Sequence, residues 1–283
     1  DLMTRHWGGQ WSGDGWTARI WAPDARQVGL VLGEQHHPME RQADGFWSIT
    51  APAREGDEYL FRIDGQDIPD PASRLQAGDV HAPSVVTRPA DPAGQMPWQG
   101  RDWAEAVIYE MHLGTFTPEG TLPAAAEKLA GLADLGITAI ELMPVGQWQG
   151  DRGWGYDGVL PYALHPAYGS PDDLRRFVDH AHSLGLMVIL DLVMNHFGPE
   201  GAYLHNAAPP FFDEARHTPW GAAIDFSQPA VREFWTQCAE YWVGTIWIAV
   251  KSTSFRRHRA CSTGVFATAM PMRLPGRSAG VAM

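Results

Sequence analysis

Short stretches of alternating apolar and polar residues run through the first 88 residues of the chain. They lie at residues 17–22, 28–32, 45–50 and 58–63, and turns rich in glycine, proline and aspartate separate them. Short alternating segments at such spacing are typical of antiparallel sheets that each bury one face. We therefore predict an immunoglobulin-like β-sandwich over residues 1–88.

A different pattern begins after residues 89–105, a stretch rich in proline and glycine that we interpret as a linker. Continuous apolar stretches then alternate with segments in which apolar residues recur at helical spacing. We predict strands at residues 107–113, 137–143 and 186–190, and helices at residues 123–135, 171–184 and 229–243. This order indicates parallel βα units, whose chemistry lies in the loops after the strands.

Two local signals sharpen this picture. Ser170 is a typical N-cap for the helix at residues 171–184, and Gly185 is a typical residue to end it. The loop between the second strand and this helix is longer than most loops of a compact domain. Its three glycines and its aromatic residues favour a shaped binding surface.

Composition then bounds the class of protein. With 283 residues, 45% of them hydrophobic and 19% charged, the chain has enough apolar residues for a folded core. A net charge of −12 argues against nucleic acid and against a membrane as partner, and the sequence has no apolar run of membrane-spanning length. The two cysteines, Cys238 and Cys261, cannot form a disulfide framework. We expect a cytoplasmic protein without a signal sequence, monomeric if it is soluble.

The charge is unevenly distributed along the chain. Residues 1–240 hold all 33 acidic residues and 15 of the 21 basic ones, so their net charge is −18. The remaining 43 residues carry six basic residues and no acidic one. A basic arm or a solvated surface segment would explain this contrast, and so would a segment that does not belong to the same protein design.

Polar residues that could take part in binding or catalysis follow the predicted strands. They are Glu110, His112 and Thr115 after the first strand, Arg152, Trp154, Tyr156 and Asp157 in the long loop, and Asp191, Asn195 and His196 after the third strand. Packing alone would explain the aromatic residues, a structural role would explain the histidine, and the strand-end aspartate could be a helix cap or a buried partner. The sequence has no phosphate-binding loop, no nucleophile elbow and no metal-ligand spacing, so we expect no metal and no cofactor.

Residues 191–196 (DLVMNH) follow the third predicted strand, and residues 136–144 (GITAIELMP) span the second. Both resemble signature regions of glycoside hydrolase family 13, the α-amylase-type barrel enzymes. Further motifs are similar to those of its trehalose-releasing subfamily, the maltooligosyltrehalose trehalohydrolases, at residues 109–120, 152–159, 195–201 and 218–221. Residues 19–23 and 69–73 resemble the sandwich that precedes the barrel in that group.

The resemblance implies a role for each candidate residue. Tyr156 matches the aromatic residue that stacks on the sugar at subsite −1, and His196 matches the histidine that hydrogen-bonds that sugar. Asp191 and Asn195 match residues that shape the site beneath it, and Trp154 completes the substrate-binding set. An aromatic platform and fixed polar groups are what a sugar ring requires. The implied substrate is maltooligosyltrehalose, cleaved at the α-1,4 bond next to its terminal trehalose unit.

The implied fold class is α/β: an N-terminal β-sandwich followed by the first three βα units of a (β/α)8 TIM barrel, over residues 106–244. In the family, the nucleophile, the acid and a stabilising aspartate follow the fourth, fifth and seventh strands. Those positions would lie beyond Gly244, so we assign no catalytic residue and expect an inactive chain. The acid-free tail at residues 245–283 replaces the expected Asp-Gly-x-Arg-x-Asp motif.

A shifted reading frame is a candidate cause of the tail. In the shifted frame the codons at Trp247 and Ile248 contain an aspartate codon, and the bases around it permit most of the family's spacing. The glycine expected after that aspartate cannot be encoded. Sequencing the coding DNA around codon 244 tests this hypothesis.

Three functions therefore stay open. The first is a trehalose-releasing α-glucan hydrolase by descent, inactive in this form. The second is a fragment of a related branching or debranching enzyme. The third is a non-catalytic α-glucan-binding protein, which alone among the three needs no catalytic carboxylates.

Overall fold

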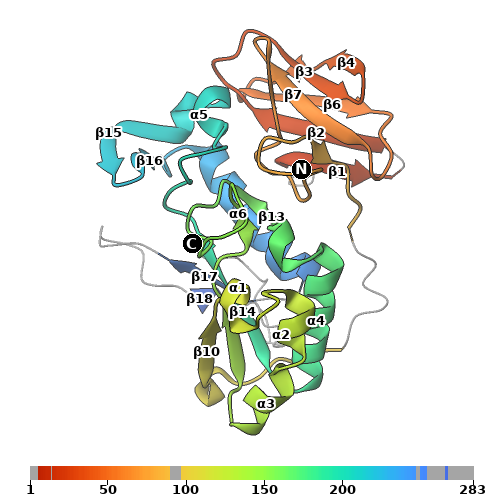
Figure 1. Ribbon diagram of the computed structural model, residues 1–283. Coiled ribbons are helices and arrows are strands. Elements are labelled where there is room, and N and C mark those ends of the chain that lie inside the picture. Colours follow the sequence, from red (N-terminus) through yellow and green to blue (C-terminus); the bar gives the residue numbers. More distant parts are fainter. Residues whose placement is uncertain (1–5, 14, 90–96, 247–248, 254–264, 267–283) are drawn as a thin grey trace, which may run out of the picture.

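The computed structural model describes residues 6–13, 15–89, 97–246, 249–253 and 265–266 (Figure 1). Its N-terminal part is a sandwich of two antiparallel sheets. The first sheet has the order β1 (Gly8–Ser12), β2 (Gly15–Trp21), β6 (Phe46–Ala51) and β5 (Glu40–Arg41). The second has the order β4 (Gln35–Pro38), β3 (Val28–Leu32), β7 (Glu58–Ile63) and β8 (Gln66–Ile68), and β9 (Ser84–Val85) also pairs with β7.

The sandwich buries the apolar faces that the alternating pattern predicts. Along β7 the buried Tyr59, Phe61 and Ile63 alternate with more exposed residues, and Trp16 and Ala18 do so at the start of β2. Because successive side chains of a strand point to opposite faces, this alternation places one row of each strand in the core. The predicted β-sandwich is confirmed.

The barrel part has a separate, mainly parallel sheet that begins at residue 108. Its order is β10 (Ile108–Met111), β11 (Ala139–Leu142), β14 (Met187–Val193), β17 (Ala249–Thr253) and β18 (Val265–Phe266). The first four strands are parallel, and β18 runs antiparallel to β17. The helices that connect them are α1 (Leu113–Phe116), α2 (Leu122–Ala126), α3 (Leu129–Asp134), α4 (Pro171–Ser183), α5 (Leu204–Ala207) and α6 (Pro229–Ile246). This arrangement confirms a partial TIM barrel.

Helix α4 has the boundaries that its sequence predicts. The Ser170 side chain accepts from the Asp173 backbone N–H, and the Asp173 carboxylate accepts from the Ser170 N–H, so both form a capping box. Gly185 ends the helix with φ +75°, a conformation that glycine adopts without steric conflict.

The predicted helix at residues 123–135 is divided into α2 and α3. Lys128 donates its backbone N–H to the Ala125 carbonyl, three residues back, so the regular helical pattern is interrupted between them. Helical spacing of apolar residues does not distinguish one long helix from two consecutive short ones, so the sequence does not predict this break.

Two hairpins lie in segments for which no strand was predicted. One pairs β12 (Gly146–Gln147) with β13 (Leu160–Leu164), and the other pairs β15 (Phe212–Thr218) with β16 (Gly221–Ile224). Short 3₁₀ turns complete the description: η3 (Trp103–Glu105), η4 (Pro166–Tyr168) and η5 (Pro209–Phe211).

The tail predicted at residues 245–283 contributes to the barrel sheet, which the expectation of three βα units did not include. Strand β17 adds a fourth parallel strand beside β14, with Ala249 opposite Ile189. Backbone pairing explains this, because an unpaired edge of β14 would leave its N–H and C=O groups without ladder partners. Most of the tail, including Cys261, lies outside the described residues.

Trp7 joins the sandwich to the barrel part. It is fully buried, packs edge-on against Phe46 of the sandwich and against Phe211 and Phe234 of the barrel part, and donates its indole N–H to the Ala230 carbonyl at 3.0 Å. Figure 1 shows α6 running between the two parts.

Within the described ranges, the helices lack the length and apolar character that a membrane crossing needs.

Candidate functional site

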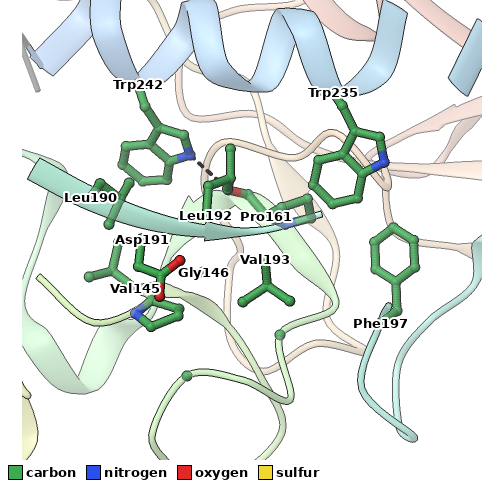
Figure 2. A pocket seen from close by; sticks show the side chains of 13 residues that line it. Val145, Gly146, Pro161, Leu190, Asp191, Leu192, Val193, Phe197, Trp235 and Trp242 are labelled. Carbon is green, nitrogen blue, oxygen red and sulfur yellow. Dashed lines mark hydrogen bonds between the residues drawn. The ribbon is translucent and has the colours of Figure 1, made fainter. Parts of the chain in front are cut away.

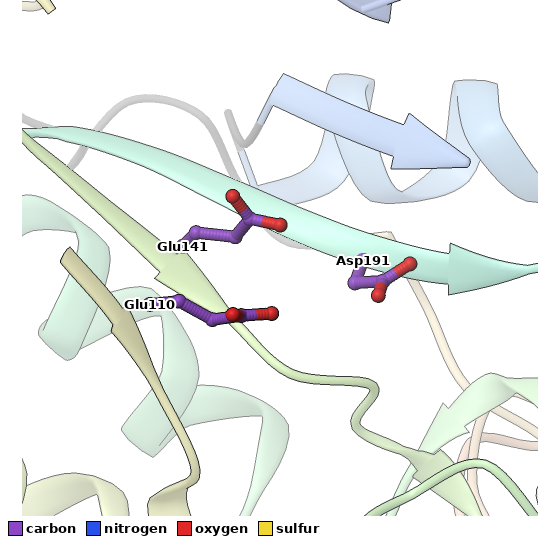
Figure 3. Close-up of side chains that lie close together, drawn as sticks. All are labelled: Glu110, Glu141 and Asp191. Atoms are coloured by element: carbon purple, nitrogen blue, oxygen red, sulfur yellow. The ribbon is translucent and has the colours of Figure 1, made fainter. Parts of the chain in front are cut away.

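Three carboxylates come together on the barrel strands (Figure 3). Glu110 on β10 is the register partner of Glu141 on β11, and Asp191 lies further along β14. Ligand atoms of all three lie within 4.8 Å of one another; Glu141 and Asp191 are buried, and Glu110 is exposed. Within the described part of the chain this is the group that could offer three oxygen ligands to a cation, but clustered carboxylates alone do not define a metal site, and we assign none.

Tyr156 connects the long loop to this cluster. Its hydroxyl donates to Asp191 Oδ2 at 3.2 Å. Burial and the Asp191 charge raise the pKa of Tyr156 well above its usual value, so the phenol stays protonated at neutral pH and donates to the carboxylate. The hydrogen bond thus fixes the ring of Tyr156 over the end of β14.

His196 follows β14 and forms a second hydrogen bond to the same loop. Its Nε2 donates to the Tyr156 backbone carbonyl at 2.7 Å, and its Nδ1 lies 2.9 Å from Asn195 Oδ1. Burial lowers the pKa of His196. A neutral imidazole that donates from Nε2 carries a lone pair on Nδ1, so Nδ1 can accept a hydrogen bond from the Asn195 amide group or from a sugar hydroxyl but cannot donate to Asn195 Oδ1.

Two exposed tryptophans flank these residues. Trp220, in the turn between β15 and β16, stacks on the His196 ring at 4.2 Å and is 51% exposed, and Trp154 in the long loop is 71% exposed. Aromatic rings of this exposure are able to pack against the apolar face of a ligand such as a sugar ring. The motif at residues 218–221 was recognised in the sequence, but Trp220 was not assigned to the site because its contact with His196 exists only in three dimensions.

Glycines allow the backbone of the long loop to lie in direct contact with the backbone of neighbouring segments. Gly155 has φ +89°, and a Cβ atom there would lie 2.1 Å from the Pro144 carbonyl oxygen. A Cβ atom on Gly198 would lie 2.0 Å from the Asp157 carbonyl oxygen. Such distances exclude any other residue at either position unless the backbone shifts.

An apolar pocket lies between β14 and α6 (Figure 2). Leu190, Leu192, Trp235 and Trp242 contribute to its lining, and the Trp242 indole N–H donates to the Pro161 carbonyl at 2.8 Å. Its lining is largely apolar, so it resembles a packing gap between strand and helix more than a site for a hydroxyl-rich ligand.

The structure brings together Tyr156, Asp191, Asn195 and His196, the residues that the resemblance had grouped, and places Trp154 on the same loop. Their roles toward a sugar stay predictions. The segment predicted to lack the catalytic carboxylates lies beyond Gly244, where side chains are outside the described part of the chain.

Two family models match the chain. The model of the alpha amylase catalytic domain matches residues 90–221, and the model of carbohydrate-binding module 48, the isoamylase N-terminal domain, matches residues 6–79. The two matches follow the order of the structure, with the sandwich first and the partial barrel second. The chain therefore belongs to the α-amylase family of glycoside hydrolases.

Named relatives narrow the comparison. Malto-oligosyltrehalose trehalohydrolase of Deinococcus radiodurans is 42% identical over 236 residues, which cover 82% of this chain and 39% of that protein. The protein of the same name from Saccharolobus solfataricus is 42% identical over 241 residues, covering 81% and 42%. The chain therefore spans about two fifths of the length of these curated relatives.

Solved structures agree. A putative alpha amylase from Salmonella typhimurium superposes with a TM-score of 0.82 and 46% identity, covering 87% of this chain and 43% of that one. A pullulanase from Paenibacillus barengoltzii superposes with a TM-score of 0.74 at 21% identity, which supports the fold alone.

Proposed function

We propose that this chain is the sugar-recognising part of a trehalose-releasing glycoside hydrolase and that it binds malto-oligosyltrehalose. The observation that carries the proposal is the junction of Tyr156, Asp191 and His196 at the end of β14, where a fixed aromatic ring and buried polar groups adjoin two exposed tryptophans. The relatives named malto-oligosyltrehalose trehalohydrolase support the choice of substrate.

The proposed contacts follow from the geometry. Tyr156 offers its ring face to one glucose unit, while Trp154 and Trp220 offer platforms for neighbouring units. A glucan chain presents an apolar face on each ring and hydroxyls around its edge, so aromatic platforms and polar groups act on different parts of the same unit.

We further propose that this chain binds without turnover. A retaining glycosidase needs two carboxyl groups about 5–5.5 Å apart on opposite sides of the scissile bond. Glu110, Glu141 and Asp191 instead converge from neighbouring strands on one region, and Asp191 already accepts from Tyr156. The resemblance assigns the nucleophile and the acid to positions beyond Gly244.

The test is isothermal titration of the full chain with a malto-oligosyltrehalose and with the plain malto-oligosaccharide of equal length, followed by product analysis. We expect binding that favours the trehalose-ended ligand, and no released trehalose. Tyr156→Ala and Trp220→Ala are expected to weaken binding, whereas Trp103→Ala, which removes an exposed tryptophan on η3, is the matched control. Absence of binding contradicts the recognition, and released trehalose contradicts the inactivity.

The same titration separates the alternatives. Equal affinity for both ligands favours a general glucan-binding protein or a branching-enzyme fragment; a 1,4-alpha-glucan branching enzyme of Prochlorococcus marinus is 31% identical over 284 residues. The cytoplasmic location and the monomeric state stay predictions, and light scattering of the purified chain tests the second.

A further inference from the structure

Three histidines from three different elements reach the backbone of the same loop. His112 precedes α1, His165 precedes η4, and His196 follows β14. Their Nε2 atoms lie close to three carbonyl oxygens of the loop: 2.9 Å from Gly150 for His165, 2.8 Å from Gly153 for His112 and 2.7 Å from Tyr156 for His196. A carbonyl oxygen only accepts, so each Nε2 carries a hydrogen and donates it.

The environment of His165 fixes its tautomer. Its Nδ1 accepts from the Ala167 backbone N–H at 3.1 Å, so its hydrogen must reside on Nε2, which faces Gly150. The ring also stacks on Trp148 with centroids 3.6 Å apart. Burial lowers the pKa of His165, which keeps the ring neutral and preserves this division between acceptor and donor.

His112 is held just as firmly. Its Nδ1 lies 3.0 Å from Thr115 Oγ1, and the Tyr168 hydroxyl lies 3.2 Å from its Nε2. The imidazole is therefore oriented by its neighbours before it reaches the carbonyl of Gly153.

The loop that receives these bonds is rich in glycine. Gly150, Gly153 and Gly155 give it a backbone with more conformational freedom than other residues would, so keeping it in one conformation costs more entropy. The bonded carbonyls recur at every third residue, and Trp154 lies between two of them. Its indole is 71% exposed, so its position depends on the backbone beneath it.

We infer that His112 and His165 are positioning residues of the sugar-binding site, which together with His196 hold the loop in the conformation that presents Trp154 and Tyr156 to a glucan. The inference rests on the proposed function for its consequence, but the clamp itself is a property of the free protein. Preorganising an aromatic loop raises affinity because less conformational entropy is lost on binding.

Hydrogen–deuterium exchange of the full chain without ligand tests the clamp directly. We expect His112→Ala to increase exchange in peptides that cover residues 149–158, and His112→Gln to restore protection, because its amide nitrogen can donate to the Gly153 carbonyl. His180→Ala is the matched control, since His180 is exposed on α4 and away from these bonds.

His165 offers a sharper pair of variants. In His165→Asn the side-chain oxygen can still accept from Ala167 but nothing reaches Gly150, whereas His165→Gln can still donate to Gly150 but loses the contact with Ala167. We expect increased exchange in the loop for the asparagine variant and protection for the glutamine variant. If both variants behave alike, or if neither alanine nor asparagine changes exchange of the loop, the clamp is wrong.

Affinity for malto-oligosyltrehalose then tests the positioning role. Loss of one such hydrogen bond is expected to weaken binding roughly fivefold, with rescue in His112→Gln. In a double-mutant cycle, His112→Ala should have a smaller effect once Trp154→Ala is present, because only its effect through Tyr156 then remains. Loosened exchange with unchanged affinity overturns the positioning role. If the unaltered chain does not bind, the proposed function fails, and the exchange data still decide whether the clamp exists.

Discussion

Single buried histidines give this chain an expected sensitivity to acid. His182 on α4 is 5% exposed, stacks on Trp98 at 4.3 Å, and its Nε2 has no hydrogen-bond partner among the described residues. Burial lowers the pKa of His182 from 6.5 to about 4. Between these two pH values the unfolded chain binds a proton that the folded chain does not, so the free energy of unfolding falls as pH drops through this window.

We predict that His182→Phe stabilises the chain and reduces this loss. The phenyl ring keeps the stacking on Trp98 and removes a buried nitrogen without a partner, which should raise the free energy of unfolding at pH 7 by about 1 kcal/mol. The loss between pH 7 and pH 4.5 should shrink by about 2 kcal/mol. Urea unfolding of both proteins at the two pH values measures this. Because Asp70 has a pKa raised by burial to about 6 and acts in the opposite direction, only the difference between the two proteins is informative.

Tyr156 allows the ring and the hydroxyl to be tested apart. We predict that Tyr156→Phe lowers the free energy of unfolding by about 1 kcal/mol, because Asp191 loses a donor in a buried site. The ring face survives this change, so glucan affinity should fall much less than in Tyr156→Ala. Titration calorimetry on both variants decides this, and equal losses would contradict the role of the ring as a platform.

At the scale of elements, the shape of the long loop depends on Gly155, which has no room for a side chain. Gly150 and Gly155 have nearly the same dihedral, φ +92° and +89°, but a Cβ atom meets nothing within 4 Å at Gly150 and the Pro144 oxygen at 2.1 Å at Gly155. We predict a loss of about 1–2 kcal/mol for Gly150→Ala, from the dihedral alone. Gly155→Ala should lose clearly more, because the loop must also move. Urea unfolding compares the two; equal losses would show that the close approach is not important.

Elements also show where prediction from sequence succeeds. Helix α4 was predicted to within one residue because Ser170 and Gly185 carry local, physically specific signals. The break between α2 and α3 and the two hairpins were not predicted, because they depend on tertiary packing. In the site, the family motifs group Tyr156 with His196. The stacking of Trp220 on His196 depends on the hairpin of β15 and β16, which no local sequence pattern predicts.

At the scale of the whole molecule, the sandwich and the barrel part share a core. Trp7 comes from the first residues of the sandwich but packs on Phe211 and Phe234, and its backbone N–H donates to Gln237 of α6 at 2.8 Å. Among the described residues, the exposed tryptophans are Trp103 in the segment that precedes the barrel part and Trp154 and Trp220 in the barrel part itself. Through Trp7, the sandwich is a structural partner of the barrel part.

This shared core leads to a prediction about cooperativity. Trp7→Ala removes a fully buried indole at the junction and should lower the free energy of unfolding by about 3–5 kcal/mol. Because the lost contacts are those between the two parts, we expect the calorimetric transition to separate into two, with the sandwich unfolding independently. Trp11→Ala is the matched control: Trp11 contacts Thr87 and Arg88 within the sandwich, so its loss should shift the transition without dividing it. A single transition in Trp7→Ala would show that other contacts, such as that of Arg74 with Tyr162 and Tyr241, couple the two parts without the tryptophan.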